Sequence, residues 1–267
     1  MSLSRSSVQI PNTTLSNNPP ANPKKNRTGL IVGNVVGVGL SLSRLALLLN
    51  FAVLLGIDLK PYTFSYSVLK TATEDFSHAN KLGEGGFGPV YKGKLSDERA
   101  ISVKQLSVAS HQGKSQFVAE IVAISAVWHH NLVKLYGCCV EGSKRLLVYE
   151  YLENNSLDQA LFGERSMNFN WSTRYDICLG VARGLAYLHE ESRLRIIHRD
   201  VKTSNILLDY ELSPKILDFG LAKLYDDKKT HISTRVAGIF VYLSPKYAMR
   251  GHLTEKTNVF AFGVVAL

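Results

Sequence analysis

The chain has 267 residues, of which 45% are hydrophobic, and a formal net charge of +9 at pH 7. This size and composition suit one large globular domain or two small ones. The basic residues are scattered and form no strong run, which disfavours nucleic acid as a partner. The three cysteines, Cys138, Cys139 and Cys178, lack any metal-ligand spacing. They therefore argue against a zinc site or a disulfide framework and favour reduced, packed thiols.

The N-terminal quarter of the chain changes composition twice. Residues 1–28 are rich in Ser, Asn, Pro and Thr, so we expect them to be disordered. Residues 29–57 are mostly Gly, Val, Leu and Ala and are long enough to cross a bilayer core of about 30 Å. Arg44 near the centre opposes insertion by roughly 2.5–3.5 kcal/mol. We predict a transmembrane helix here; an apolar helix packed on the domain, or an anchor lying on the membrane surface, remains an alternative.

The remaining elements follow in an order typical of an α+β domain. Alternating apolar residues predict strands at 99–104 and 145–151, and apolar residues at helical spacing predict helices at 115–125 and 174–189. Strands come first and long helices later, so we expect a small sheet-rich part that precedes a helical part. The aromatic residues at the start of the second helix, Trp171 above all, are expected in the core.

A glycine-rich segment, LGEGGFGPVYKG, occupies residues 82–93. Glycines allow a strand–turn–strand to bring bare backbone close to a ligand, although a glycine-rich hairpin without a ligand is an equal alternative for this segment alone. Lys104 follows on a predicted strand, and Glu120 lies on the predicted helix at 115–125. Either residue, taken alone, could be a solvated surface charge.

Two further motifs combine carboxylates, cations and an amide. The segment HRDVKTSN spans residues 198–205, and the tripeptide DFG follows at residues 218–220. Each motif alone is weak, but their order along the chain is not accidental. Together with the glycine-rich segment, Lys104 and Glu120, they resemble the signature set of protein kinases.

Within that family the chain is most similar to plant receptor-like serine/threonine kinases of the leucine-rich-repeat type. The similarity rests on LGEGGFGPVYKG, LVKLYGCC, LLVYEYLENNSL and HRDVKTSNILLD. It implies an α+β, bilobal protein-kinase-like fold, with a small β-rich N-terminal lobe and a truncated helical C-terminal lobe over residues 82–267. Residues 58–81 would be a juxtamembrane segment. It also implies ATP and Mg²⁺ as cofactors, a protein substrate with Ser or Thr hydroxyls, and a co-receptor or kinase dimer partner.

The resemblance assigns a role to each motif. His198 is expected to be a packed structural residue, and Glu120 to hold Lys104 in an ion pair. The catalytic set would be Asp200, Lys202, Lys104 and Glu120, and the metal ligands Asn205 and Asp218. The regulatory set would be Arg199, which would dock a phosphorylated activation segment, and the hydroxyls placed to receive that phosphate, on Thr230, Ser233 and Thr234. The nucleotide would contact Leu82, Gly83, Glu84, Gly85, Gly86, Phe87, Gly88, Val90, Lys104, Tyr149, Glu150 and Tyr151.

Three positions depart from the family pattern. Ile239 stands where a Thr would support the catalytic Asp, Lys246 where a Glu would anchor the activation segment, and Asn258 where an Asp would tie a central helix to the catalytic loop. We expect Asn258 to keep the shape of that tie but to lose its charge. The final segment, 259–267, is apolar on every face, and we expect it to leave an exposed hydrophobic patch. The alternative to an active kinase is therefore a catalytically weak ATP-binding remnant that acts as an interaction module.

Membrane orientation is ambiguous from charge. Lys24, Lys25 and Arg27 precede the apolar segment, so the positive-inside rule alone would place the N-terminus in the cytosol. The resemblance demands the reverse, a single-pass protein of the plasma membrane with its kinase domain in the cytosol. We favour the resemblance because its motifs are more specific than a bias of three charges.

Overall fold

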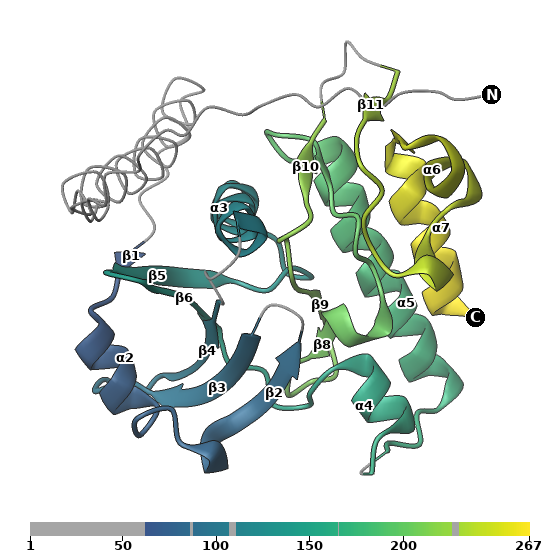
Figure 1. The fold of residues 1–267 in the computed structure, drawn as a ribbon. Coiled ribbons are helices and arrows are strands. Elements are labelled where there is room, and N and C mark those ends of the chain that lie inside the picture. Colours follow the sequence, from purple (N-terminus) through teal and green to yellow (C-terminus); the bar gives the residue numbers. More distant parts are fainter. Residues whose placement is uncertain (1–61, 86–87, 107–110, 165, 226–229) are drawn as a thin grey trace, which may run out of the picture. The chain divides into compact units, whose positions relative to one another are not determined.

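The structure is a computed structural model that describes residues 62–267 except 86–87, 107–110, 165 and 226–229 (Figure 1). The predicted disordered segment (1–28) and the predicted membrane span (29–57) lie outside the described residues, as do the first four residues of the predicted juxtamembrane segment. Within the part that is described, no helix has the length and apolar character needed to span a membrane.

The N-terminal lobe is built on a six-stranded sheet in the order β1-β5-β6-β4-β3-β2. All neighbours pair antiparallel except β1 and β5, which are parallel. The two strands predicted at 99–104 and 145–151 are β4 and β6, each shifted by one residue. The strands are β1 (Tyr62–Thr63), β2 (Lys81–Gly85), β3 (Gly88–Lys94), β4 (Ala100–Gln105), β5 (Leu135–Glu141) and β6 (Lys144–Glu150).

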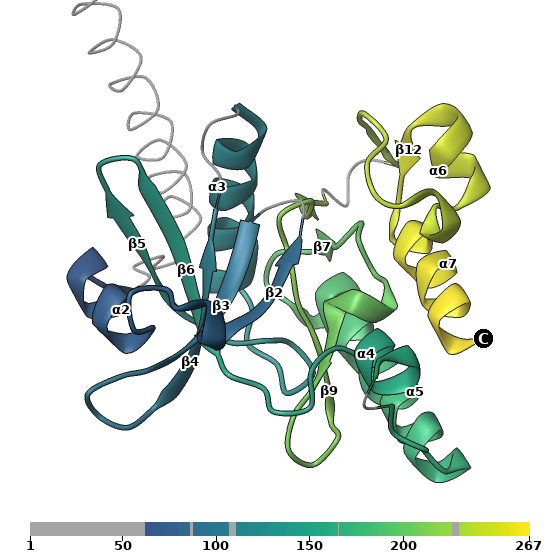
Figure 2. The ribbon, with the colours of Figure 1, turned by 60° about the horizontal axis from the view of Figure 1, so that its bottom comes forward.

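Two helices cover opposite faces of this sheet, α2 (Tyr66–Ala72) and α3 (His111–Ser125) (Figures 1 and 2). Alternate residues of a strand point to opposite faces, so β6 contributes to two separate clusters. Leu146 packs in the cluster that contains Leu69 of α2. Leu147 packs in the larger cluster that contains Phe117 of α3 and extends into the C-terminal lobe. The four consecutive residues 146–149 are all buried, so β6 does not show the alternation predicted from its sequence; it is covered on both faces.

The C-terminal lobe is mainly helical, which confirms the predicted bilobal α+β arrangement. Its helices are α4 (Leu157–Phe162), α5 (Trp171–Ala186), α6 (Pro245–Arg250) and α7 (Glu255–Ala266), with a π-helical turn, η2 (Tyr187–Glu191), after α5. Three short antiparallel pairs accompany them: β8 (Ile206–Leu208) with β9 (Pro214–Ile216), β10 (Lys223–Leu224) with β7 (Ile196–Ile197), and β11 (Ile232–Ser233) with β12 (His252–Leu253). Single 3₁₀ turns are η1 (His78–Asn80), η3 (Thr203–Asn205) and η4 (Phe240–Tyr242).

Helix α5 packs very closely on strand β9 through two glycines one turn apart. A Cβ on Gly180 would lie 2.5 Å from Cγ of Pro214, and a Cβ on Gly184 would lie 3.0 Å from Cδ1 of Ile216. The distance at Gly180 is shorter than Cβ atoms adopt, so that position requires glycine, and at Gly184 the side chain of Ile216 would have to shift to admit a Cβ. The contact positions the site, because the chain passes from β9 directly into Asp218.

The prediction that Trp171 belongs to the core is wrong. Its side chain is 79% exposed and that of Tyr175 is 58% exposed. The buried face of α5 is formed by Ile177, Val181 and their neighbours. At 3.6 residues per turn, Tyr175 is rotated by about 200° from Ile177 and faces solvent.

The three cysteines carry free thiols, as expected. Cys138 and Cys139 are buried in β5, opposite Leu147 and Leu146 of β6. Burial raises the pKa of the Cys139 thiol to about 11, which keeps it protonated and unreactive at neutral pH. These residues contribute to packing.

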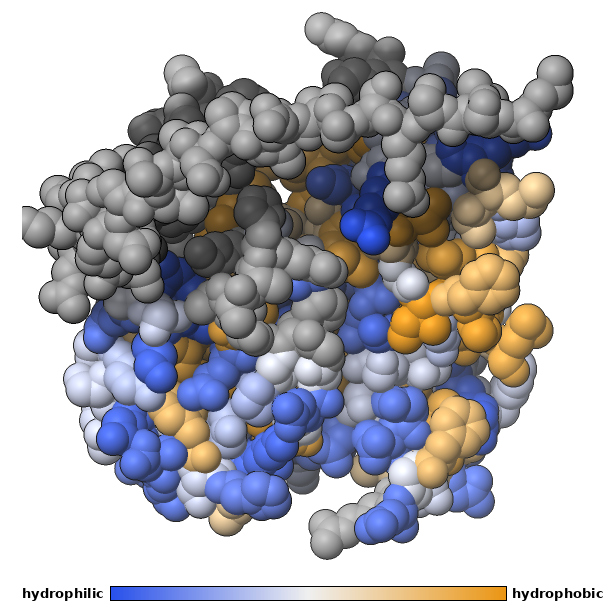
Figure 3. All heavy atoms as spheres, viewed as in Figure 1, coloured by the Kyte–Doolittle hydropathy of each residue, from blue (hydrophilic) through white to orange (hydrophobic). Residues whose placement is uncertain are grey.

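Helix α7 presents hydrophobic side chains to the surface, as its sequence predicts. Asn258 and Ala261 are buried, whereas Val259 is 55% and Phe260 is 39% exposed. Hydrophobic side chains gather on the right of the view in Figure 3, where Figure 1 places α6 and α7. This is the exposed apolar patch expected for residues 259–267.

The α5–β9 contact gives a direct test of packing. We expect Gly180→Ala to lower the thermal midpoint of the full chain, with a loss of about 1–3 kcal/mol, because the added methyl group overpacks Pro214. Gly263→Ala in α7 is the matched control. A Cβ there meets no atom of the described residues within 4 Å, so this change should be neutral or stabilise the helix by up to about 1 kcal/mol. Equal shifts for the two variants in thermal unfolding followed by circular dichroism would contradict the close contact.

Candidate active site

The glycine-rich segment forms the hairpin of β2 and β3, in which Gly85 pairs with Gly88. Gly88 has a φ of +122°, a backbone conformation that favours glycine. A Cβ on Gly83 or Gly85 would meet no atom of the described residues within 4 Å. The packing of the described residues therefore does not require glycine at these two positions. Gly86 and Phe87 lie outside the described residues.

Strand pairing places this hairpin beside a buried lysine. Val90 of β3 is the register partner of Lys104 of β4. Lys104 Nζ lies 3.2 Å from Glu120 Oε2 in α3 and 3.2 Å from Asp218 Oδ2 in the C-terminal lobe. The predicted Lys104–Glu120 ion pair is confirmed. The second partner, Asp218, links the two lobes and was not anticipated from the sequence.

Burial and pairing act against each other at this lysine. Burial disfavours the charge on Lys104, but the carboxylates of Glu120 and Asp218 outweigh it and raise the pKa of the ammonium group above its ordinary value. Burial also raises the pKa of Glu120, which Lys104 opposes. The hydroxyl of Tyr149 donates to Glu120 Oε1. Burial raises the pKa of Tyr149 well above its ordinary value, so the hydroxyl keeps the proton that it donates.

The chain leaves the sheet after Glu150 and continues toward the C-terminal lobe. Glu150 ends β6, where its Oε1 accepts from the backbone N–H of Lys134 at 2.8 Å and lies 3.3 Å from Lys215 Nζ. Tyr151 lies under Lys92 Nζ, 4.3 Å from the ring centroid. Leu82, Glu84 and Val90 belong to the hairpin strands β2 and β3. The predicted nucleotide-contacting residues that are described thus come from neighbouring strands of one sheet, except Tyr151, which follows the end of β6.

The segment 198–205 forms a compact loop around Asp200. Lys202 Nζ lies 2.8 Å from Asp200 Oδ2. The amide nitrogen of Asn205 donates to the same oxygen at 2.9 Å and to the backbone oxygen of Asp200 at 2.8 Å. Asn205 therefore turns its amide oxygen away from Asp200. An amide oxygen and a carboxylate oxygen are hard ligands, so Asn205 and Asp218 are chemically suited to Mg²⁺.

Asp218 is held in position by its own turn. Its φ is +71°, which is uncommon for a residue with a side chain, and its Oδ1 accepts from the N–H of Gly220 at 3.2 Å. The backbone N–H of Leu217 donates to the carbonyl of Asn205 at 2.9 Å. This bond fixes Asp218 and Asn205, the two expected metal ligands, on neighbouring segments.

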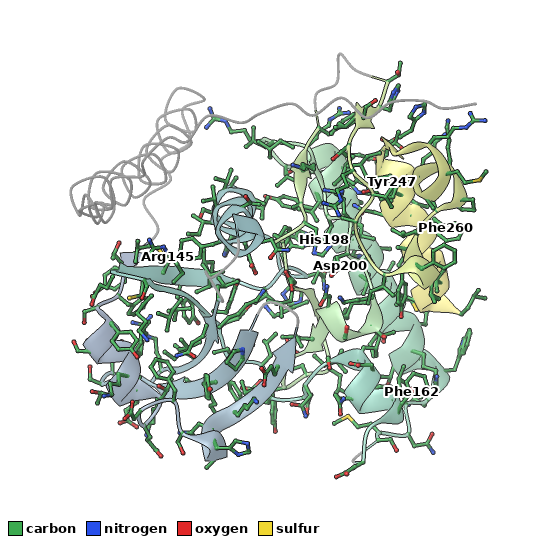
Figure 4. All side chains as sticks on the ribbon, viewed as in Figure 1. Arg145, Phe162, His198, Asp200, Tyr247 and Phe260 are labelled. Carbon is green, nitrogen blue, oxygen red and sulfur yellow. The ribbon has the colours of Figure 1, made fainter. Side chains whose placement is uncertain are left out.

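His198 is a packed structural residue, as predicted. Its side chain is fully buried and meets the ring of Phe219 edge to face, with centroids 4.8 Å apart. Its Nδ1 accepts from the N–H of Asp200 at 3.3 Å, and its Nε2 lies 3.0 Å from the carbonyl of Leu217. Burial lowers the pKa of His198, which favours the neutral ring that this pattern requires. His198 and Asp200 lie together on the loop between the sheet and the helices (Figure 4).

Arg199 is enclosed by hydrogen bonds rather than exposed. Its guanidinium group donates to the carbonyls of Leu221 and Arg235, at 3.1 and 2.8 Å, and to the hydroxyl of Tyr247. Its backbone N–H donates to Oδ1 of Asn258 at 3.0 Å. The docking of a phosphorylated segment on Arg199 stays a prediction.

Tyr247 is the residue that sequence reasoning missed. It lies in α6, is fully buried, and its hydroxyl also accepts from the N–H of Ala237 at 3.1 Å (Figure 4). The hydroxyl group of Tyr247 thus links Arg199 to the segment before α6. The only signal in the sequence is an aromatic residue immediately after Pro245 and Lys246, which does not reveal burial against an arginine.

The three predicted phosphorylation sites lie on the segment that precedes α6. Thr230 and Ser233 are exposed, and Thr234 is half-buried. Thr230 Oγ1 lies 3.1 Å from Nδ1 of His231, and Ser233 belongs to β11, which pairs with β12. The phosphorylation of these residues stays a prediction.

The three departures from the family pattern differ in their surroundings. Ile239 and Lys246 are exposed. Asn258 is fully buried and still ties α7 to the catalytic loop through Arg199. The expectation that Asn258 keeps the shape of this tie is confirmed.

Comparison with known proteins decides the family. Residues 76–267 match the family described as protein tyrosine and serine/threonine kinase. The chain belongs to this family. Two proteins of Arabidopsis thaliana, each named a probable LRR receptor-like serine/threonine-protein kinase, are 68% identical over 266 residues, which is 95% of this chain and 26% of each relative. A third is 62% identical over 213 residues, 79% of this chain and 22% of the relative. The chain thus spans about a quarter of the length of these relatives, and the predicted resemblance is confirmed.

The role of Tyr247 can be tested without disturbing the ring packing. We expect Tyr247→Phe to destabilise the full chain by about 1–3 kcal/mol, because a hydrogen bond to the buried Arg199 cation and one to Ala237 N–H are lost. Tyr210→Phe is the matched control, since Tyr210 is exposed. Chemical denaturation followed by intrinsic fluorescence measures both. A Tyr247→Phe chain as stable as the control would show that the hydroxyl does not anchor Arg199.

Proposed function

We propose that this chain carries the kinase domain of a receptor-like serine/threonine kinase, which transfers the γ-phosphate of ATP to Ser or Thr hydroxyls of a protein. The observation that carries the proposal is the convergence of Lys104, Glu120 and Asp218 next to the Asp200–Asn205 loop. Phosphoryl transfer needs little covalent help and depends on charge neutralisation and on holding two oxygens in line. This site supplies cations, carboxylates and an amide, which are the groups that such chemistry uses.

The glycine hairpin is suited to phosphate oxygens. The packing of the described residues does not require glycine at Gly83 or Gly85, which supports a role for these positions in the close approach of a ligand to the backbone. Lys104 reaches the α- and β-phosphates while Glu120 and Asp218 keep it charged. Leu82, Val90 and the backbone of Glu150 and Tyr151 contact the nucleoside.

The catalytic loop positions the acceptor. Asp200 accepts or orients the proton of the substrate hydroxyl, since its carboxylate is already oriented by Lys202 and Asn205. Lys202 also stabilises the charge on the transferring phosphate, and its position two residues after Asp200 is typical of kinases that act on Ser and Thr. Asn205 and Asp218 would hold Mg²⁺, which neutralises phosphate oxygens when bound.

One observation favours the alternative, a catalytically weak nucleotide-binding domain. Ile239 cannot form the hydrogen bond that a Thr would give toward Asp200, and Lys246 cannot form an ion pair with a cation. Both functions keep the same nucleotide site, so only phosphate transfer separates them.

We expect Lys104→Ala to weaken Mg·ATP binding at least tenfold in the full chain, because the cation facing the phosphates is lost. Lys70→Ala, on the exposed side of α2, is the control and should bind like the wild type. Isothermal titration calorimetry measures both. Equal affinity of Lys104→Ala and wild type would overturn the assignment of Lys104.

Transfer to a protein substrate distinguishes the two functions. Asp200→Asn should retain nucleotide affinity while transfer of radiolabelled phosphate falls about 10²–10⁴-fold, the usual contribution of a positioned acid or base. Nucleotide binding without any transfer by the wild type would favour the weak-kinase alternative. Transfer that does not depend on Asp200 would contradict the site.

We further propose that residues 29–57 anchor the chain in the plasma membrane with the kinase domain in the cytosol, in keeping with its receptor-like relatives. The sequons at Asn12 and Asn26 precede that segment. Expressed in a plant cell, the full chain should carry an enzyme-removable glycan on Asn12, which Asn12→Gln abolishes. Glycan on Asn154 or Asn170 would instead place the kinase domain in the lumen.

A further inference from the structure

Asn258 of α7 lies between the catalytic loop and the π-helical turn η2. Its Oδ1 is 3.0 Å from the backbone nitrogen of Arg199, and its Nδ2 is 2.8 Å from Nε2 of His189. The N–H of Arg199 can only donate, so the atom that faces it must be the amide oxygen. The amide nitrogen of Asn258 therefore faces His189.

This orientation determines the protonation of His189. An amide nitrogen carries two hydrogens and cannot accept, so Nε2 of His189 must offer its lone pair. The ring is then neutral, with its proton on Nδ1. An imidazolium ring would place two donors 2.8 Å apart, and the pair would separate.

The charged and titratable groups around His189 come from each element packed against it. Glu190 lies on the same turn, Glu255 on α7 and His198 on the catalytic loop, while Arg195 and Tyr225 line the same cavity of about 150 Å³. Burial is the largest influence and lowers the pKa of His189, Glu255 and Glu190 oppose it, and His198 adds to it. The net effect favours the neutral ring at pH 7.

We propose that His189 is a positioning residue of the kinase reaction: its neutral ring holds the Asn258 amide, which holds Arg199 and so the loop that carries Asp200. Protonation of His189 releases this chain of hydrogen bonds. The link is specific to an amide at position 258. A carboxylate there would still accept from Arg199, but its second oxygen would favour the imidazolium form. The inference rests on the proposed function for its effect on transfer, but the hydrogen-bond chain itself can be tested without activity.

The direction of the pH effect follows from the lowered pKa. Where the folded pKa of a histidine lies below the unfolded value of about 6.5, the unfolded state binds the proton more tightly. The contribution of His189 to stability is therefore fully present above that value and is lost as the pH falls below it. In Asn258→Asp the sign reverses: the raised pKa adds stability at low pH, which is lost as the pH rises through the new pKa.

The first measurement is an NMR titration of the His189 ring Cε1–H in the full chain, assigned by its disappearance in His189→Gln. We expect the wild-type ring to titrate below pH 6.5 and the Asn258→Asp ring to titrate at least one pH unit higher than in the wild type, a tenfold change in proton affinity. An unchanged titration in Asn258→Asp would overturn the proposal, whether or not the chain transfers phosphate.

The second measurement is the thermal midpoint, and the transfer rate where present, between pH 5.5 and 8.0. In the wild type, the thermal midpoint and the transfer rate should both fall as the pH drops below 6.5. His189→Gln should keep both at neutral pH and lose part of this acid sensitivity, because the Gln oxygen accepts from Asn258 but does not titrate. His198 and the other titratable groups are common to all variants, so the acid loss that persists in His189→Gln belongs to groups other than His189. An acid loss of the same size in wild type and His189→Gln would overturn the proposal even if Asn258→Asp fails to fold.

Discussion

The ion pairs of Lys104 are the interaction on which the rest of this domain depends. A buried ammonium group is costly unless it is paired and hydrogen-bonded, and Lys104 is satisfied by carboxylates from α3 and from the segment after β9. The two partners lie on different elements, Glu120 on α3 and Asp218 after β9. The packing of Phe117 places α3 against the sheet, and the register of β3 and β4 places the glycine hairpin beside the lysine. The ion pair between Lys104 and Asp218 thus joins the two lobes at the candidate active site.

The catalytic loop is supported from the opposite side by the C-terminal helices. Arg199 is bound through its guanidinium group by Tyr247 of α6 and through its backbone by Asn258 of α7. Asp200, which follows Arg199 in the loop, is oriented by Lys202 and Asn205. A substitution in α6 or α7 that breaks these hydrogen bonds would therefore displace the Asp200 carboxylate, although neither helix contacts it through these bonds.

The departures from the family pattern differ in consequence because their environments differ. Ile239 and Lys246 lie in solvent, so their cost is a missing interaction. Asn258 is buried, and a buried amide must satisfy both its oxygen and its nitrogen. A carboxylate at position 258 would favour the protonated ring of His189, whereas the amide of Asn258 favours the neutral ring. A substitution that preserves shape can thus alter a pH response.

The sequence alone predicted the fold class, the elements β4, β6 and α3, and the candidate site residues that the structure brings together around Lys104 and Asp200. Periodicity predicts strands and helices, and the motifs and their order indicate the chemistry, because both can be read along the chain without knowledge of its packing. Trp171 was misplaced because periodicity does not say which face of a helix meets the core. The burial of Tyr247 against Arg199, the second partner of Lys104 and the orientation of Asn258 were decided only by the tertiary structure. In each of these three contacts the two residues are 48 or more positions apart in the chain. Such contacts form only when packing brings together elements that are distant in the sequence.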